Sequence, residues 1–391
     1  MSRWHSYLNS AASILQQYSG EEPFASFLKK YFSAKKKYGS RDRKQIAHLC
    51  YCYFRLGWLI READLKERIV TGLFLCCTKP IDFFSEVKPE WKEAVLLNTK
   101  DKCSLIKLDN CTSGIFPWVD ELSNGIDSLQ FNASFLVQPD LFLRVRPGYG
   151  AVVKKKIEKA LITYEAVNES CISFSNSVKL DDVLELNKEA VIQDYNSQQV
   201  GALLKIVRWK SPDKRLKIWD CCAASGGKSI MAKDILGNIV LAVSDIRESI
   251  IYNLRKRFSE AGISEYKTFV SDLTAGATLP SDEMFDLVIA DVPCSGSGTW
   301  SRTPEQLFYF KESEIDRYAK LQQKIVLTVL PHIKPGGYLL YITCSVFKKE
   351  NEEMVSFIEN KSGCNVIAKE WLIGYDKKAD TMFASLLQKP L

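Results

Sequence analysis

The chain has 391 residues, 46% of them hydrophobic and 26% charged, with a formal net charge of +6. This composition is ordinary for a globular protein, and the length allows two or three domains, each with its own core. No apolar run approaches the ~18 residues that cross a membrane, and the N-terminal stretch lacks the apolar core of a secretory signal. We therefore expect a cytoplasmic protein with no membrane partner.

Twelve cysteines are scattered along the chain, and none of them forms a CxxC pair. Without a secretory signal, reduced thiols are the favoured interpretation over disulfides. The adjacent pairs Cys76/Cys77 and Cys221/Cys222 lack the ~2 to 4 residue spacing of structural zinc sites, so we predict no bound metal. Only three histidines occur, which makes a carboxylate or a thiolate the expected general base.

The first region, residues 1–110, is predicted to be helical, because apolar residues recur with helical periodicity in IAHLCYCYFRLGWLI. Residues 1–75 contain 13 Lys and Arg against 6 Asp and Glu, and the densest basic run is 29–44. Cations interleaved with aromatic residues can hold a phosphate backbone and stack on bases. The alternative is a solvated helix face followed by a loop. The candidate RNA contacts in this run are Lys35, Lys36, Lys37, Arg41 and Arg43.

The second region, residues 111–200, changes to short alternating runs such as LFLRVRPG at 141–148, followed by a Lys-rich helical pattern. Alternation of this kind beside a helix predicts a small α+β unit. Arg144 and Arg146 share one face of the predicted strand, where they would help to present an RNA target. The alternative for this pair is a simple solvent-facing edge.

In the third region, residues 201–391, strand-like runs alternate with helix-like runs, which is typical of a parallel, doubly wound sheet. The five predicted strands are RLKIWD, IVLAVSD, YKTFVSD, FDLVIADV and GGYLLYIT. The first runs into WDCCAASGGKS, whose paired glycines allow a sharp turn and a close approach to a ligand at a helix start. A phosphate-binding P-loop is disfavoured because Cys222 stands where that motif needs glycine.

Acidic residues end three of these strands: Asp245 the second, Asp272 the third and Asp291 the fourth. Ligands of open α/β sheets bind beyond the carboxyl ends of the strands. An acid after the second strand can hold ribose hydroxyls, and one after the third can accept a hydrogen bond from an adenine amino group, which suits S-adenosylmethionine. Taken singly, each aspartate has the alternative role of a helix N-cap.

Two thiols follow the last two predicted strands, Cys294 in DVPCSGSG and Cys344 in ITCS. If these strands are neighbours, ~4.8 Å apart, both thiols enter one crevice beside the methyl donor. C5 of cytosine is a poor nucleophile, but a thiolate that adds to C6 activates it, and a second thiol can assist the elimination. Asp291 could then hold the protonated N3. The alternative, two buried strand ends, is disfavoured by the Pro and Thr before the thiols and by the flexible loop after Cys294.

These motifs resemble those of the RsmB/Fmu/Nop-type RNA cytosine-C5 methyltransferases, and within them the branch that acts on bacterial 16S ribosomal RNA. The likeness covers the chain from about residue 140 onward. It implies a Rossmann-like, S-adenosylmethionine-dependent domain in which Cys344 is the nucleophile and Cys294 aids release of the product. It also assigns Asp245 to the ribose and Asp272 to the adenine.

By the same resemblance, Asp291 contacts the cytosine and borders the cofactor, and Lys228 lies in the cofactor or catalytic cleft. The cofactor signature implies binding by Cys222, Ala223, Ala224, Ser225, Gly226, Gly227 and Lys228. Two departures occur: Ser225 stands where the family usually has proline, and the segment after residue 370 is compressed. In the first region, YGSRDRKQIAHLCYCYFRL is similar to the helical NusB-like RNA-binding module of that family.

We therefore predict a NusB-like helical domain (1–110), a small α+β RNA-binding or linker domain (111–200) and a Rossmann-like methyltransferase domain (201–391). The predicted activity is S-adenosylmethionine-dependent methylation of cytosine C5 in 16S ribosomal RNA. A monomer would act on this RNA or on a small-subunit assembly intermediate, with Arg302 among its RNA contacts. The alternatives are transfer RNA as the substrate, and a non-catalytic RNA-binding assembly factor that keeps the fold.

Overall fold

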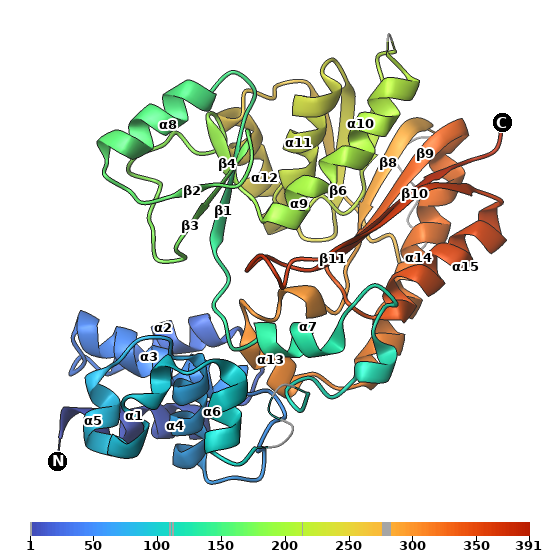
Figure 1. The fold of residues 1–391 in the computed structure, drawn as a ribbon. Helices are drawn as coiled ribbons and strands as arrows, with labels where there is room; N and C mark the ends of the chain where they lie inside the picture. The colour runs from blue at the N-terminus through green and yellow to red at the C-terminus, as the bar shows by residue number, and fades with distance from the viewer. Residues whose placement is uncertain (1, 109–110, 112, 213, 276–282) are drawn as a thin grey trace. The chain divides into compact units, whose positions relative to one another are not determined.

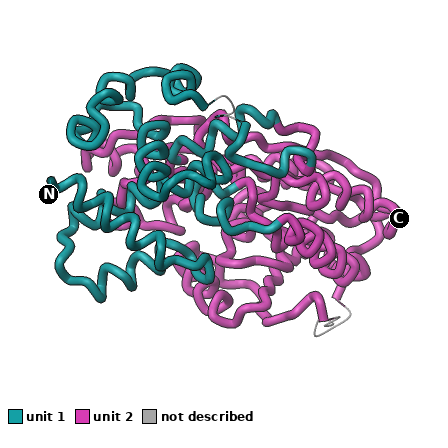
Figure 2. The backbone as a smooth tube through the Cα atoms, turned by 90° about the horizontal axis from the view of Figure 1, so that it is seen from below, with its two compact units in different colours: residues 1–120, 127–138, 299–311 teal, residues 121–126, 139–298, 312–391 magenta. Residues whose placement is uncertain are grey.

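The computed structural model describes all residues except 1, 109–110, 112, 213 and 276–282. Its internal contacts divide the chain into two compact units (Figure 2). Unit 1 comprises Met1–Asp120, Asp127–Gln138 and Thr299–Lys311. Unit 2 comprises Glu121–Ile126, Pro139–Gly298 and Glu312–Leu391. The predicted boundary at residue 110 lies outside the described residues, and the division into three domains stays a prediction.

Unit 1 is helical, as predicted for the first region (Figure 1). Apolar residues at helical spacing bury one face of each of the first three helices, whereas the fourth is buried on all sides from Arg68 to Leu75. Asp64 caps the fourth helix by accepting hydrogen bonds from the N–H groups of Lys66 and Glu67. The core is rich in aromatic side chains, including Phe24, Phe54 and Phe74. The helices are α1 Arg3–Gln17, α2 Phe24–Ala34, α3 Ser40–Arg55, α4 Leu65–Cys76, α5 Asp82–Val87, α6 Thr99–Leu105, α7 Ser128–Ser134 and α13 Pro304–Tyr309.

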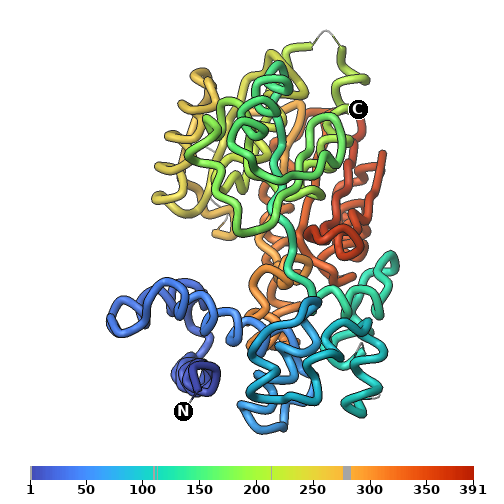
Figure 3. Tube along the Cα trace, turned by 60° about the vertical axis from the view of Figure 1, so that its left-hand side comes forward, coloured from blue at the N-terminus to red at the C-terminus, as the bar shows by residue number. Residues whose placement is uncertain are grey.

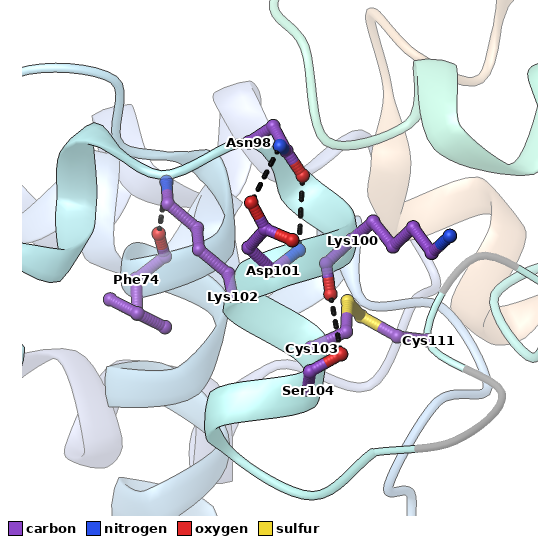
Figure 4. The surroundings of a disulfide bond; sticks show 8 residues. All are labelled: Phe74, Asn98, Lys100, Asp101, Lys102, Cys103, Ser104 and Cys111. Atoms are coloured by element: carbon purple, nitrogen blue, oxygen red, sulfur yellow. Dashed lines mark hydrogen bonds between the residues drawn. A yellow bond between two sulfur atoms is a disulfide. The ribbon is translucent and has the colours of Figure 1, made fainter.

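One pair of cysteines departs from the prediction of reduced thiols. Cys103 in α6 and Cys111 after it form a disulfide, with their Cα atoms 5.9 Å apart (Figure 4). The prediction was wrong for this pair because the chain turns back after α6 and brings the two side chains together, which residue spacing alone does not reveal. The other ten cysteines of the chain are free.

Unit 2 begins with a small antiparallel sheet of strand order β2-β3-β1-β4. Its strands are β1 Leu141–Val145, β2 Glu165–Ala166, β3 Cys171–Phe174 and β4 Ala190–Ile192. Helix α8, Gly150–Lys159, packs Val153 and Ile157 into the same core as Leu143 and Ile172. The predicted small α+β unit is therefore present, and its sheet begins at residue 141.

The large sheet of unit 2 has the strand order β10-β11-β9-β8-β5-β6-β7. Strands β5 to β9 are parallel, whereas β11 pairs antiparallel with β9 and β10 antiparallel with β11. Each of the five predicted strands is present. The bounds are β5 Lys217–Asp220, β6 Val240–Asp245, β7 Tyr266–Val270, β8 Phe285–Asp291, β9 Ile333–Thr343, β10 Asn365–Leu372 and β11 Met382–Gln388.

Helices cover both faces of this sheet, as a doubly wound fold requires. One face is packed by α10 Gly201–Lys210, α11 Gly227–Leu236 and α12 Glu248–Glu260. The other is packed by α14 Ser313–Val329 and α15 Glu352–Ser362. The short helix α9, Tyr195–Gln199, links the small sheet to α10. Figure 3 shows the small sheet, in green, lying beside the yellow-green helices of the first group.

No helix among the described residues combines the length and apolarity that crossing a membrane requires. The compressed segment at the end of the chain forms β11, whose residues from Met382 to Leu387 are all buried. This strand was not among those predicted from the sequence. It places the last residues of the chain within the sheet, between β9 and β10.

Candidate active site

The loop between β5 and α11 holds the predicted cofactor signature. Ala224 and Gly226 have positive φ angles of 45° and 81°, and a Cβ atom on Gly226 would meet the ring of Phe258 at 2.5 Å. Only glycine fits at position 226 without strain. Ser225, which departs from the family's proline, accepts a hydrogen bond from Arg257 at 2.7 Å. The departure is therefore accommodated by a hydrogen bond that proline could not accept.

Lys228, in the first turn of α11, connects this loop to the end of β8. Its Nζ atom donates to Oδ2 of Asp291 at 3.0 Å and to Oγ of Ser197 at 2.8 Å. Lys228 is buried, while the Asp291 side chain keeps 30% of its surface exposed. The ammonium group thus holds the carboxylate in place and leaves part of it accessible to a ligand.

Three carboxylates follow the adjacent strands β5, β6 and β7. Asp245 accepts hydrogen bonds from the Ala224 N–H at 3.1 Å and from the Arg247 Nε at 2.9 Å. Burial alone would raise the pKa of Asp245, but these hydrogen bonds outweigh it and the pKa is lowered. The hydroxyl and N–H of Thr274 both donate to Asp272 and lower its pKa.

The third carboxylate, Asp220 at the end of β5, was not assigned a role from the sequence. It is completely buried, Ser229 Oγ donates to its Oδ2 at 2.6 Å, and its Oδ1 has no hydrogen-bond partner among the described residues. Burial raises the pKa of Asp220 to about 7. Its position at the end of a predicted strand was the signal that could have identified it, although it pairs with Val243 and Ile289, each two residues before the acid of its own strand.

The two thiols meet beyond the ends of β8 and β9, which are neighbours as expected. The Sγ atoms of Cys294 and Cys344 lie 3.3 Å apart. The Gly298 N–H donates to the Cys344 carbonyl at 2.9 Å, and a Cβ atom on Gly298 would lie 1.8 Å from the Thr381 carbonyl oxygen. The loop after Cys294 therefore packs against Cys344 and against Thr381, the residue before β11, so closely that only glycine fits at position 298.

Arg144 and Arg146, predicted to help present an RNA target, do not form the solvent-facing edge that was the alternative either, because both contact α11. Arg144 donates to Asp234 of α11 at 2.7 Å, and Arg146 donates to the other oxygen of the same carboxylate at 2.8 Å. The side chains of Arg144 and Asp234 keep only 8% and 6% of their surface exposed. This burial argues against RNA contact by Arg144, because the guanidinium already neutralises a carboxylate inside the fold.

The basic run predicted to contact RNA lies in unit 1, at the end of α2 and the start of α3. Lys36, Lys37, Arg41 and Arg43 are exposed, whereas Lys35 is half-buried and its Nζ lies 2.9 Å from Tyr31 Oη. Arg302 also belongs to unit 1, in the turn before α13. RNA contact by these residues stays a prediction.

Residues 207–380 match the family model described as 16S rRNA methyltransferase RsmB/F. Ribosomal RNA small subunit methyltransferase B from Cronobacter sakazakii is 33% identical over 168 residues, which are 42% of this chain and 37% of that protein. The protein of the same name from Enterobacter sp. strain 638 is 31% identical over 176 residues, covering 45% and 40%. The chain thus spans about two fifths of the length of these curated relatives.

Solved structures share the fold at lower sequence identity. The crystal structure of PH0851 has a TM-score of 0.70 and 18% identity, and covers 97% of each chain. NSun6 from Pyrococcus horikoshii, solved with SFG, has a TM-score of 0.57 and 12% identity, and covers 67% of this chain and 94% of that chain. The Rossmann-like methyltransferase fold predicted from the sequence is confirmed.

Proposed function

We propose, from the premise that residues 207–380 belong to the RsmB/F methyltransferase family, that this chain methylates C5 of cytosine in small-subunit ribosomal RNA. The observation that carries the proposal is the pair of thiols, Cys294 and Cys344, with sulfur atoms 3.3 Å apart beyond two adjacent parallel strands. Methylation of an exocyclic amino group or a hydroxyl needs no thiol. Methylation of C5 needs a thiol to activate the ring, and a second thiol can assist the elimination that releases the product.

In this proposal Cys344 adds to C6 of the base, which makes C5 nucleophilic. Asp291, held by Lys228, faces N3 of the ring as the adduct forms and breaks. Cys294 assists the removal of the C5 proton and the breaking of the bond between Cys344 and C6. The hydrogen bond with Cys344, burial and the charge of Glu350 all raise the pKa of Cys294, which makes its thiolate a stronger base for the C5 proton.

S-adenosylmethionine, when bound, supplies an electrophilic methyl group. The loop from Cys222 to Lys228 and the carboxylates of Asp245 and Asp272 would hold it. The residues present fit such a cationic group, because Asp220 Oδ1 is a buried acceptor that lacks a partner among the described residues. NSun6, a neighbour in fold, was solved with SFG, an analogue of this cofactor.

The choice of 16S ribosomal RNA rests on the names of the relatives, which are small-subunit methyltransferases. The basic residues of unit 1 would supply sequence-independent contacts with the phosphate backbone. We propose a monomer that acts in the cytoplasm, on the RNA or on a small-subunit assembly intermediate.

The experiment measures transfer of labelled methyl from S-adenosylmethionine to unmodified 16S ribosomal RNA and to transfer RNA transcripts. It compares wild type, Cys344→Ala and Cys294→Ala, and a denaturing gel detects covalent protein-RNA adducts. We expect Cys344→Ala to be inactive without an adduct, and Cys294→Ala to accumulate one because release fails.

Reversed behaviour of the two variants would keep the reaction and overturn the choice of nucleophile. Methylation of transfer RNA alone would change the substrate. Absence of methylated cytosine with every RNA, for wild type, would favour a non-catalytic assembly factor over an enzyme.

A further inference from the structure

A buried carboxylate, Glu350, joins the two loops that carry the thiols. Its Oε2 atom accepts a hydrogen bond from the N–H of Ser295, the residue after Cys294, at 2.9 Å. Its Oε1 atom accepts one from Oγ of Ser345, the residue after Cys344, at 2.6 Å. The two oxygens of one side chain therefore hold the two residues that directly follow the thiols.

Gln322 of α14 extends this contact to the other side of Cys294. Its Nε2 atom donates to Glu350 Oε2 at 2.8 Å and to the carbonyl of Pro293, the residue before Cys294, at 3.1 Å. The Tyr341 hydroxyl lies 3.0 Å from Gln322 Oε1 and 2.8 Å from the Glu350 carbonyl. The loop of Cys294 is thus held on both sides of the thiol by groups that have no exposed surface.

Stability alone does not account for a carboxylate at this position. Burial raises the pKa of Glu350, which means that its charged form is disfavoured by the surroundings even though several donors point at it. Well-packed apolar residues in place of buried charges are often neutral or stabilising. A carboxylate is nevertheless suited to this place, because it can accept hydrogen bonds from both loops at once.

We propose that Glu350 is a positioning residue, which holds Cys294 and Cys344 at the separation that addition to the base and elimination from it require. The inference rests on the proposed function, since it gives the two thiols their roles. It adds a residue that touches neither the RNA base nor the cofactor, and it assigns Gln322 a supporting part in the same arrangement.

The test is Glu350→Gln, which keeps the shape of the side chain but turns one acceptor toward the loops into a donor. Glu353→Gln is the matched control. This substitution makes the same change in charge three residues away, at an exposed position. The first readout needs no RNA: the rate at which iodoacetamide alkylates Cys294 in the folded protein, followed by mass spectrometry. We expect about a tenfold increase for Glu350→Gln, because loss of the neighbouring carboxylate lowers the pKa of the Cys294 thiol, and no change for the control.

The second readout is methyl transfer. We expect Glu350→Gln to lower kcat by about 10²-fold, as a displaced catalytic group does, with the KM for RNA unchanged. Wild-type alkylation rates and wild-type kcat in this variant would overturn the proposal. If Glu350→Gln does not fold, Gln322→Leu repeats both measurements with the carboxylate intact, and wild-type values there would overturn it too.

The alkylation result separates this inference from the proposed function. Suppose that Cys294 is alkylated faster in Glu350→Gln, but that neither this variant nor wild type methylates any RNA. This result would support the positioning of the thiol by Glu350 and refute the proposed reaction. Methylation of RNA by wild type, with unchanged alkylation and turnover in Glu350→Gln, would support the proposed reaction and refute the positioning role of Glu350.

Discussion

Lys228 Nζ lies 3.0 Å from Asp291 Oδ2, so one ion pair connects the start of α11, after the proposed cofactor loop, to the last residue of β8. Replacing Lys228 by Met keeps the length of the side chain and removes the charge, which frees Asp291 to turn away from the base. We predict that methyl transfer falls by about 10²-fold, because the misplaced carboxylate no longer faces the ring. The free energy of unfolding should fall by only about 1 kcal/mol, since Asp291 is partly solvated.

Labelled-methyl transfer and urea unfolding measure these two effects. The control is Lys233→Met, the same substitution later in α11, which should leave the methylation rate unchanged. Near-wild-type turnover in Lys228→Met would show that Asp291 holds its position without the ion pair.

A second prediction concerns the carboxylate of Asp234, which both Arg144 and Arg146 contact. Asp234→Ala leaves two buried guanidinium groups without their counter-charge. We predict a loss of about 3 kcal/mol in the free energy of unfolding, the range for breaking a buried ion pair. Asp316→Ala, which removes a carboxylate paired with Lys349 at 60% exposure, should cost about 0.5 kcal/mol. Equal effects of the two variants in urea unfolding would contradict the structural role of Asp234.

The methyltransferase domain was predictable because its sequence combines strand periodicity with acids and thiols at strand ends. Parallel neighbours place their carboxyl ends together, so the meeting of Cys294 with Cys344 followed from the adjacency of β8 and β9. The aspartates after β6 and β8 could be placed at the same edge by this rule. Local sequence was enough here because each group lies at the end of its own strand.

Contacts between distant segments were not predictable from the sequence. Arg144 meets Asp234, 90 residues away, only because the small sheet packs beside α11. Glu350 accepts a hydrogen bond from Gln322, 28 residues earlier, and no local pattern marks a carboxylate that will be buried between two loops. Alternation in a strand such as β1 tells which residues share a face, but whether that face meets solvent or another element depends on packing.

A third prediction tests the basic run of unit 1. The triple variant Lys36→Ala, Lys37→Ala and Arg41→Ala removes three exposed cations. If each neutralises one RNA phosphate, the slope of log affinity against log salt should become shallower by about 2. RNA binding measured by fluorescence anisotropy at several salt concentrations gives this slope.

The matched control removes the same number of cations from α14 and α15, outside the two regions predicted to bind RNA, by Lys320→Ala, Lys324→Ala and Lys361→Ala, whose side chains are also exposed. A change confined to the first variant supports contact by the basic run. Equal changes of slope in the two variants would show that the affinity for RNA follows net charge and that the basic run makes no specific contact with RNA.

The last prediction concerns Asp220, whose pKa is raised to about 7 by burial from an ordinary value of 3.8. The folded chain keeps this proton over a range in which the unfolded chain has released it. At Asp220 the folded state therefore binds more protons between pH 4 and pH 7, and the contribution of this residue to the free energy of unfolding must decrease as the pH rises through that window. Asp220→Asn cannot titrate, so the stability of wild type relative to this variant should fall by up to about 4 kcal/mol from pH 4 to pH 7, and then stay level.

Urea unfolding of both proteins at intervals from pH 4 to pH 8 measures that difference, and other titrating groups cancel in it. Asp376→Asn, at a side chain that is 46% exposed, is the control for the substitution itself. A difference for Asp220→Asn that stays constant with pH would mean that Asp220 is ionised in the folded protein. Its buried Oδ1 atom would then carry a charge that no described group hydrogen-bonds.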